Sequence, residues 1–114
     1  MNAESKADGP SAVKMLVKID EDLKELTGTM TAPEDGYFVG YMFTENGGSG
    51  SIHGTIFRGG REQFSAGCSC QWGGAVKIPY GSYSYPAKTG DQFRYDIEFN
   101  GCYGGVGFST TGEH

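Results

Sequence analysis

The segment from Thr31 to Phe43 separates two kinds of hydrophobic pattern and most limits what this chain can fold into. Before it, apolar residues recur at spacings of three and four, as they do along one face of a helix. Within it, Pro33 and Gly36 indicate a turn. Over residues 37–43, two sets of side chains alternate with the two-residue period that is typical of a strand. The sets are Tyr37, Val39, Tyr41 and Phe43, and Phe38, Gly40 and Met42. The sequence therefore predicts a short helix followed by an all-β region.

The chain divides into three regions on this basis. Residues 1–10 are polar and predict an N-terminal arm. Residues 11–28 have helical spacing, with Ser11 placed to cap the helix and Gly28 placed to end it. Residues 29–114 are predicted to form a head domain. The expected fold class is mainly β, a small jelly-roll-like β-sandwich preceded by one short helix.

The predicted helix has an apolar seam built on alternating four- and three-residue steps. About two heptads span only roughly 22 Å, and a lone helix of that length is marginal in water. The helix is therefore expected to pack either on its own β domain or on the same helix in neighbouring copies. In the second case it is an oligomerisation helix that favours three or four strands. Its seam positions are Leu16, Ile19, Leu23 and Leu26.

Glycine-rich turns divide the β region into about seven short strands, a spacing that indicates a sandwich or jelly roll. Gly59 and Gly60 are expected to form one such turn. Residues 80–86 are aromatic and turn-like, and Pro86 excludes them from the centre of a sheet. Predicted strands lie at 37–43, at 51–57, within 61–72, at 92–99 and from 102 to 109.

The clearest strand signal is the alternation over residues 92–99. Its apolar half is expected to face the core and its charged half to face away from it. Asn100-Gly101 follows, which is a strong hairpin signal. The residues predicted to face the core are Phe93, Tyr95, Ile97 and Phe99.

Composition and charge argue against several classes of protein. Sixteen of the 20 glycines follow residue 46, but 14 Phe and Tyr residues argue against a disordered tail. A net charge of −5 with scattered basic residues disfavours nucleic acid as a partner. No apolar run is long enough to insert in a membrane. The polar N-terminus lacks the apolar core of a signal peptide, so folding in a cytoplasm is expected.

The three cysteines are the best candidates for metal ligands in the sequence. Cys68 and Cys70 share one face of a strand about 6.6 Å apart, which suits a shared zinc ion poorly. Neither Cys102 nor His53 completes such a site, so no metal and no cofactor are expected. Free thiols are expected in a cytoplasm. A disulfide from Cys102 to either Cys68 or Cys70 stays open.

No catalytic set is apparent, so the chain is not expected to be an enzyme. His53 and His114 lack a neighbouring nucleophile motif. Asp96 and Glu98 resemble a glycosidase carboxylate pair, but their alternation with Arg94 more simply marks a solvated or interface face.

An aromatic cluster is the best candidate for binding. Tyr and Trp offer flat apolar rings with a polar handle, which suits both sugar stacking and protein interfaces. Ordinary core or inter-subunit packing is the first interpretation of these rings, and the binding hypothesis places Trp72, Tyr83 and Tyr85 on exposed loops. The candidate residues are Trp72, Tyr80, Tyr83 and Tyr85.

Several short motifs resemble those of bacteriophage tail-fibre and receptor-binding head domains. The motifs are Ala32-Pro33, Asp35-Gly36-Tyr37, Gly90-Asp91 and Phe108, within residues 29–110. Members of that family are small trimeric β-sandwiches, loosely similar to the C1q and tumour-necrosis-factor jelly rolls. The resemblance implies a homotrimer whose N-terminal arm and helix contact other virion proteins and whose head contacts a host-surface glycan or protein.

The expected function is therefore that of a phage virion structural protein, assembled in the host cytoplasm and located in the virion. A fibre tip or head domain that contacts the host cell is the leading interpretation. A capsid decoration or head-fibre protein is the first alternative. A cellular carbohydrate-binding module is the second, and the missing secretion signal counts against it.

Overall fold

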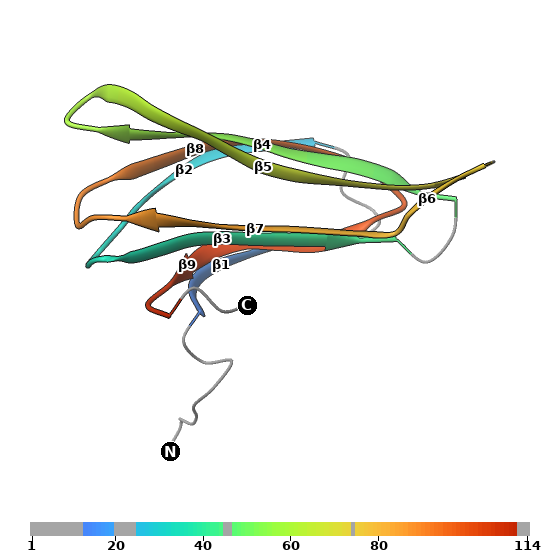
Figure 1. The fold of residues 1–114 in the computed structure, drawn as a ribbon, viewed down its shortest axis with the longest axis horizontal. Helices are drawn as coiled ribbons and strands as arrows, with labels where there is room; N and C mark the ends of the chain where they lie inside the picture. The colour runs from blue at the N-terminus through green and yellow to red at the C-terminus, as the bar shows by residue number, and fades with distance from the viewer. Residues whose placement is uncertain (1–12, 20–24, 45–46, 74, 112–114) are drawn as a thin grey trace, which may run out of the picture.

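A computed structural model of the chain describes residues 13–19, 25–44, 47–73 and 75–111. These residues form two antiparallel sheets that face each other as the layers of a β-sandwich (Figure 1). The four-stranded sheet has the order β1 (Val13–Ile19), β9 (Tyr103–Ser109), β3 (Gly36–Phe43) and β7 (Tyr80–Ala87). The five-stranded sheet has the order β2 (Glu25–Thr31), β8 (Gln92–Asn100), β4 (Ser49–Arg58), β5 (Arg61–Gly73) and β6 (Val76–Ile78).

Most connections carry the chain from one sheet to the other. Along the chain, each strand of the four-stranded sheet is next to a strand of the five-stranded sheet. The strands of the four-stranded sheet are β1, β3, β7 and β9. The connection from β4 to β5 stays within one sheet. It turns at Gly59 and Gly60, whose φ angles of 61° and 81° suit glycine. This hairpin confirms the predicted turn.

The core lies between the sheets and consists mainly of aromatic and aliphatic side chains. Phe38 of β3 stacks on Phe93 of β8 with 5.3 Å between ring centroids, so the pair joins the two layers. Phe108 meets Phe38 edge to face at 6.1 Å. Other fully buried core residues are Met42, Ile52, Ile56, Ile97, Cys102 and Val106.

Glycines in the strands leave room for rings from neighbouring strands. At three glycines in strand interiors, an added Cβ atom would overlap an aromatic ring on the adjacent strand. A glycine in a strand interior is unfavourable by itself, and a close approach of this kind is a common reason for it. The ring covers the gap that the missing side chain leaves. The pairs are Gly28 with Tyr95, Gly40 with Tyr83, and Gly54 with Phe93.

Several sequence predictions of strands are confirmed. β3 and β4 cover the predicted strands at 37–43 and 51–57. β8 covers residues 92–99, with Phe93, Ile97 and Phe99 buried and Tyr95 packed against the core. Pro86 lies in β7, at the edge of its sheet.

The predicted helix over 11–28 is wrong for the part of that range that the structure describes. Val13–Ile19 is a strand paired with β9, and residues 25–28 belong to a strand paired with β8. β-Branched Val and Thr residues favour extended backbone here. Leu26, Gly28 and Met30 alternate inward with exposed threonines. Residues 1–12 and 20–24, which include Leu23 and the predicted arm, lie outside the described residues.

Two further local predictions are corrected. Residues 80–86 are not turn-like, because Tyr80–Ala87 pairs along its whole length with β3. Asn100-Gly101 does not close a hairpin within one sheet. It carries the chain from β8 in one sheet to β9 in the other, with Gly101 at a φ of 74°.

Candidate functional site

The outer surface of the four-stranded sheet is the main candidate site, and it is aromatic. Strand alternation turns the residues between Phe38 and Met42 away from the core. We call this surface the aromatic face. It consists of Leu16, Tyr37, Tyr41, Phe43, Tyr80 and Tyr103; Val39 has the same strand parity but is buried. Among the side chains that the structure describes there, Lys18 is the only charged one, and the tyrosine hydroxyls are polar but neutral.

The aromatic face is locally ordered by ring packing. Phe43 pairs in register with Tyr80 on one side and with Tyr103 on the other. Its ring stacks on that of Tyr103, with 5.3 Å between centroids and 20° between planes. Leu16 crosses above Gly105, where a Cβ atom would lie 3.0 Å from its Cδ1. Leu16 is 41%, Phe43 37% and Tyr80 56% exposed, so large apolar side chains face outward in the chain.

The edge strand β6 carries further exposed apolar side chains, and Ile78 borders a hollow on the outer surface of the five-stranded sheet together with Gln71 and Glu98. Val76 and Ile78 flank Lys77 and are 39% and 56% exposed. β6 pairs with β5 alone among the described strands, so its other edge is unpaired. We call this surface the apolar edge, and it consists of Val76 and Ile78.

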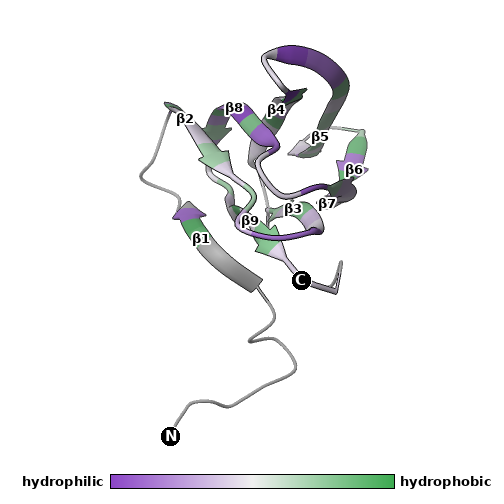
Figure 2. Cartoon of the chain, turned by 90° about the vertical axis from the view of Figure 1, so that its left-hand side faces the viewer, coloured by the Kyte–Doolittle hydropathy of each residue, from purple (hydrophilic) through white to green (hydrophobic). Residues whose placement is uncertain are grey.

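The outer surface of the five-stranded sheet is polar. Asp96 and Glu98 are exposed there beside Arg94, as the alternation predicted. His53 lies between Asp96 and Gly67 in register. The β4–β5 hairpin at the end of this sheet has a hydrophilic colour in Figure 2. Serine and threonine side chains complete this polar face, among them Thr27, Thr29, Ser51, Thr55, Ser65 and Ser69.

The four aromatic residues predicted to bind do not form one surface. Tyr83 is buried in the core, 5.8 Å from Phe93, so its predicted exposure is wrong. Tyr85 is half-buried beside it at 6.4 Å. Trp72 is half-buried on β5, with the Lys77 ammonium 5.8 Å from its ring centroid. Only Tyr80 is widely exposed, and all four lie on strands rather than loops.

The sequence pattern did not identify two aromatic residues of the outer surface, Phe43, which is exposed, and Tyr103, which is half-buried. Phe43 and Tyr103 were not singled out, because the predicted strand pattern does not say which of two apolar faces is the inner one. Residues 37–43 are apolar at both odd and even positions, so both faces of this strand carry apolar side chains. Such a pattern indicates that both faces of the strand are covered.

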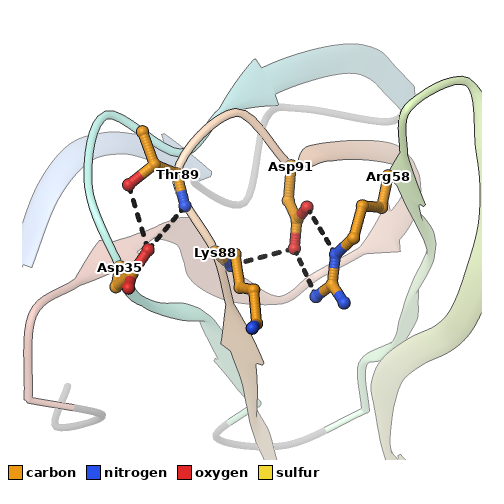
Figure 3. A network of polar contacts seen from close by, with 5 residues as sticks. All are labelled: Asp35, Arg58, Lys88, Thr89 and Asp91. Atoms are coloured by element: carbon orange, nitrogen blue, oxygen red, sulfur yellow. Dashed lines mark hydrogen bonds and ion pairs between the residues drawn. The ribbon is translucent and has the colours of Figure 1, made fainter.

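A network of polar contacts fixes one end of the sandwich (Figure 3). Arg58 donates two hydrogen bonds to the Asp91 carboxylate, at 3.0 and 2.9 Å, and the Lys88 amide donates a third at 2.9 Å. The bonds from Arg58, and then that from Lys88, hold the pKa of Asp91 below its ordinary value against the opposing effect of burial. This network ties the end of β4 to the turn before β8.

The neighbouring turn is fixed in a similar way. Asp35 accepts hydrogen bonds from the Thr89 amide at 2.8 Å and from its hydroxyl at 3.0 Å, which lower the Asp35 pKa (Figure 3). The resemblance motifs Asp35-Gly36 and Gly90-Asp91 therefore serve as turn anchors.

An open pocket lies next to this network. Its apolar wall comes from Phe64, Tyr85 and Pro86, and Phe64 is 49% exposed. Arg58 and Lys88 add positive charge at its rim. Flat rings beside charged hydrogen-bond donors suit a polar ligand with an apolar side.

The three cysteines lie inside the sandwich. Cys70 and Cys102 are buried and Cys68 is half-buried. Within the described residues, no group of three or more His, Cys, Asp or Glu side chains is placed to hold a metal ion. Burial raises the pKa of Cys68 to about 11 and that of Cys70 to about 12, so both are thiols at neutral pH.

No family model matches the sequence, and searches of curated proteins and of solved structures found no match. In the described part of the chain, no helix has the length and apolar character needed to cross a membrane.

Proposed function

We propose that this chain is a structural protein of a bacteriophage virion, a homotrimeric head domain that contacts the host cell surface. The observation that carries the proposal is the aromatic face. Contiguous exposed apolar surface on a small domain commonly marks a protein interface. Enrichment in Tyr and Phe with few charges is typical of the centre of such an interface.

The oligomer is proposed to form through strands, since the predicted helix is absent from the described part of residues 11–28. The aromatic face and the apolar edge are two different surfaces. When one surface of a subunit meets a different surface of the next, the contact is heterologous, and it closes into a ring when each copy is rotated by one third of a turn from the last. Packing the edge of one copy against the face of the next would cover Phe43, Ile78 and Tyr80 and would leave the polar face in solvent.

The strand order supports the resemblance to trimeric virion head domains. An order of β1-β9-β3-β7 over β2-β8-β4-β5 is that of an eight-stranded jelly roll, with β6 as an added edge strand. Fold by itself does not establish function, so the virion role rests on this order, the short motifs and the aromatic face together.

Host contact is proposed at the surfaces that a trimer leaves exposed. The pocket beside Phe64 and Tyr85 lies at the end of β7 and is bordered by Tyr37 at the rim of the aromatic face. In a trimer this pocket is presented three times, so weak binding of a surface glycan or protein gains from avidity.

Electron microscopy of purified phage particles with gold-labelled antibody against the chain tests the proposal. Label at the fibre or tail tip is expected, and antibody pretreatment should reduce adsorption to host cells. Preincubating the antibody with purified chain is the control and should abolish the label. Label spread over the capsid would support the decoration alternative, and unlabelled particles would exclude a virion role.

A further inference from the structure

Two of the three cysteines meet in the core although they lie far apart in the sequence. Cys70 is on β5 and is 2% exposed, and Cys102 is in the turn between β8 and β9 and is 0% exposed. Their Sγ atoms are 3.4 Å apart. The two thiols are therefore within hydrogen-bond distance of each other. A pair this close is a candidate for a disulfide bond.

We propose that Cys70 and Cys102 form an inter-sheet disulfide when the protein meets a small oxidant of the peroxide class. A disulfide requires an S–S length of about 2.05 Å. We expect rotation of the two short side chains to close the gap from 3.4 Å. The bridge would join the five-stranded sheet to the turn that leads into the four-stranded sheet.

The surroundings hold both cysteines in place. The Thr44 hydroxyl donates to the Gly101 carbonyl at 3.1 Å, which fixes the turn before Cys102. The Trp72 amide donates to the Gly48 carbonyl at 2.9 Å, which fixes β5 just after Cys70. A preorganised pair of this kind forms a bridge with little backbone strain.

The structure also separates Cys68 from this pair. Cys68 lies beneath β7, where a Cβ atom at Gly81 would be 3.2 Å from its own Cβ. The alternative bridge from Cys68 to Cys102 is therefore the less favourable one, and Cys68 remains as the odd thiol.

The reaction balances with one peroxide for each bridge. One cysteine thiolate attacks a peroxide oxygen, the O–O bond breaks, and water leaves after protonation, which gives a sulfenic acid. The second thiol then attacks the sulfenic sulfur, the S–O bond breaks, and a second water leaves. Two sulfurs are each oxidised by one electron, and the peroxide takes up both electrons.

Burial is expected to make this reaction slow. The thiolate is the reactive form, and burial raises the pKa of Cys70 to about 12. The pair is therefore expected to stay reduced in a cytoplasm and to oxidise slowly outside the cell. The bridge would then stabilise the chain by restricting its unfolded state. This inference does not depend on the proposed function.

Peptide mapping after peroxide treatment of the full chain tests the proposal. Tryptic cleavage places Cys68 and Cys70 together in residues 62–77 and Cys102 in residues 95–114. A crosslink between these two peptides is expected without reductant, together with a fall from three free thiols to one in denaturant. Dithiothreitol should reverse both changes, and the melting temperature should be roughly 10–20 °C higher with the bridge.

Single variants decide which cysteine takes part. The Cys68→Ser variant should keep the crosslink, whereas Cys70→Ser and Cys102→Ser should lose it. A crosslink that is lost in Cys68→Ser would overturn the assignment. So would three thiols that stay free, or that oxidise to sulfinic acids without a crosslink. The wild-type chain and Cys68→Ser are sufficient if the other two variants do not fold.

Discussion

Among the described residues, the hydroxyl of Tyr83 is the one buried side-chain polar atom without a hydrogen-bond partner. Its ring fills the space above Gly40 and packs on Phe93, so the ring contributes to the core. The hydroxyl group does not stabilise the core, because transferring a hydroxyl from water to the interior without a hydrogen-bond partner costs free energy. Burial accordingly raises the pKa of Tyr83.

Replacing Tyr83 by Phe keeps the ring and removes the unpaired hydroxyl. We expect the free energy of unfolding to rise by about 1 kcal/mol, measured by urea denaturation. Tyr80→Phe, which changes an exposed tyrosine in the same strand, is the control and should have little effect. A loss of stability in Tyr83→Phe would mean that the hydroxyl has a partner.

Asp91 makes the stability of the fold depend on pH. Its pKa is below the ordinary value of about 3.9. The bonds from Arg58 and Lys88 therefore contribute stability that is fully present above pH 4 and is lost as the pH falls through the folded-state pKa. Asp35 acts in the same direction.

The Asp91→Asn variant should be less stable than the wild type at pH 7 by about 1–3 kcal/mol, because it loses charged hydrogen bonds. Its melting temperature should also change less between pH 5 and pH 2. Asp96→Asn, on the polar face, is the matched control and should behave as the wild type does. An equal acid response in wild type and Asp91→Asn would show that another group controls it.

At the scale of elements, sequence pattern succeeds where one face is apolar and the other is charged. β8 is the clearest case, since its charged half cannot be buried without partners. The aromatic half must then face the core. The prediction fails at residues 25–28, where a leucine at helical spacing coincides with the start of a threonine-rich strand. Pairing with β8 makes this segment a strand and not a helix. A local sequence pattern carries no information about that pairing.

The candidate site was less predictable for a related reason. Strand β3 is apolar at both parities, so alternation alone cannot separate core side chains from those on the aromatic face. Tyr83 and Tyr85 were expected on a loop because Pro86 follows them, but a proline is also compatible with an edge strand. Edge position is a property of the assembled sheet.

Truncating Phe93 tests the face assignment of β8. Its ring is fully buried and lies 5.3 Å from Phe38 and 5.8 Å from Tyr83. Phe93→Ala should lower the free energy of unfolding by roughly 3–5 kcal/mol, measured by denaturant titration. Arg94→Ala, at the next and outward position, is the control. An unchanged midpoint for Phe93→Ala would show that this face is not the core.

At the scale of the whole molecule, the two sheets divide the surface into an aromatic face and a polar face. A chain of 114 residues buries a limited fraction of its surface when it folds alone. Association through the aromatic face would add apolar burial that the single subunit lacks. The account therefore requires that the chain assemble in solution and that the aromatic face be the contact.

Sedimentation equilibrium at micromolar concentration, on the wild type and two matched variants, tests this requirement most directly. Phe43→Glu places a charge on the aromatic face, whereas Phe64→Glu makes the same change at an exposed phenylalanine of the other sheet. The account predicts three times the 12.2 kDa chain mass for the wild type and Phe64→Glu, and the single-chain mass for a folded Phe43→Glu. A monomeric or dimeric wild type, or a Phe43→Glu variant that stays trimeric, would contradict it.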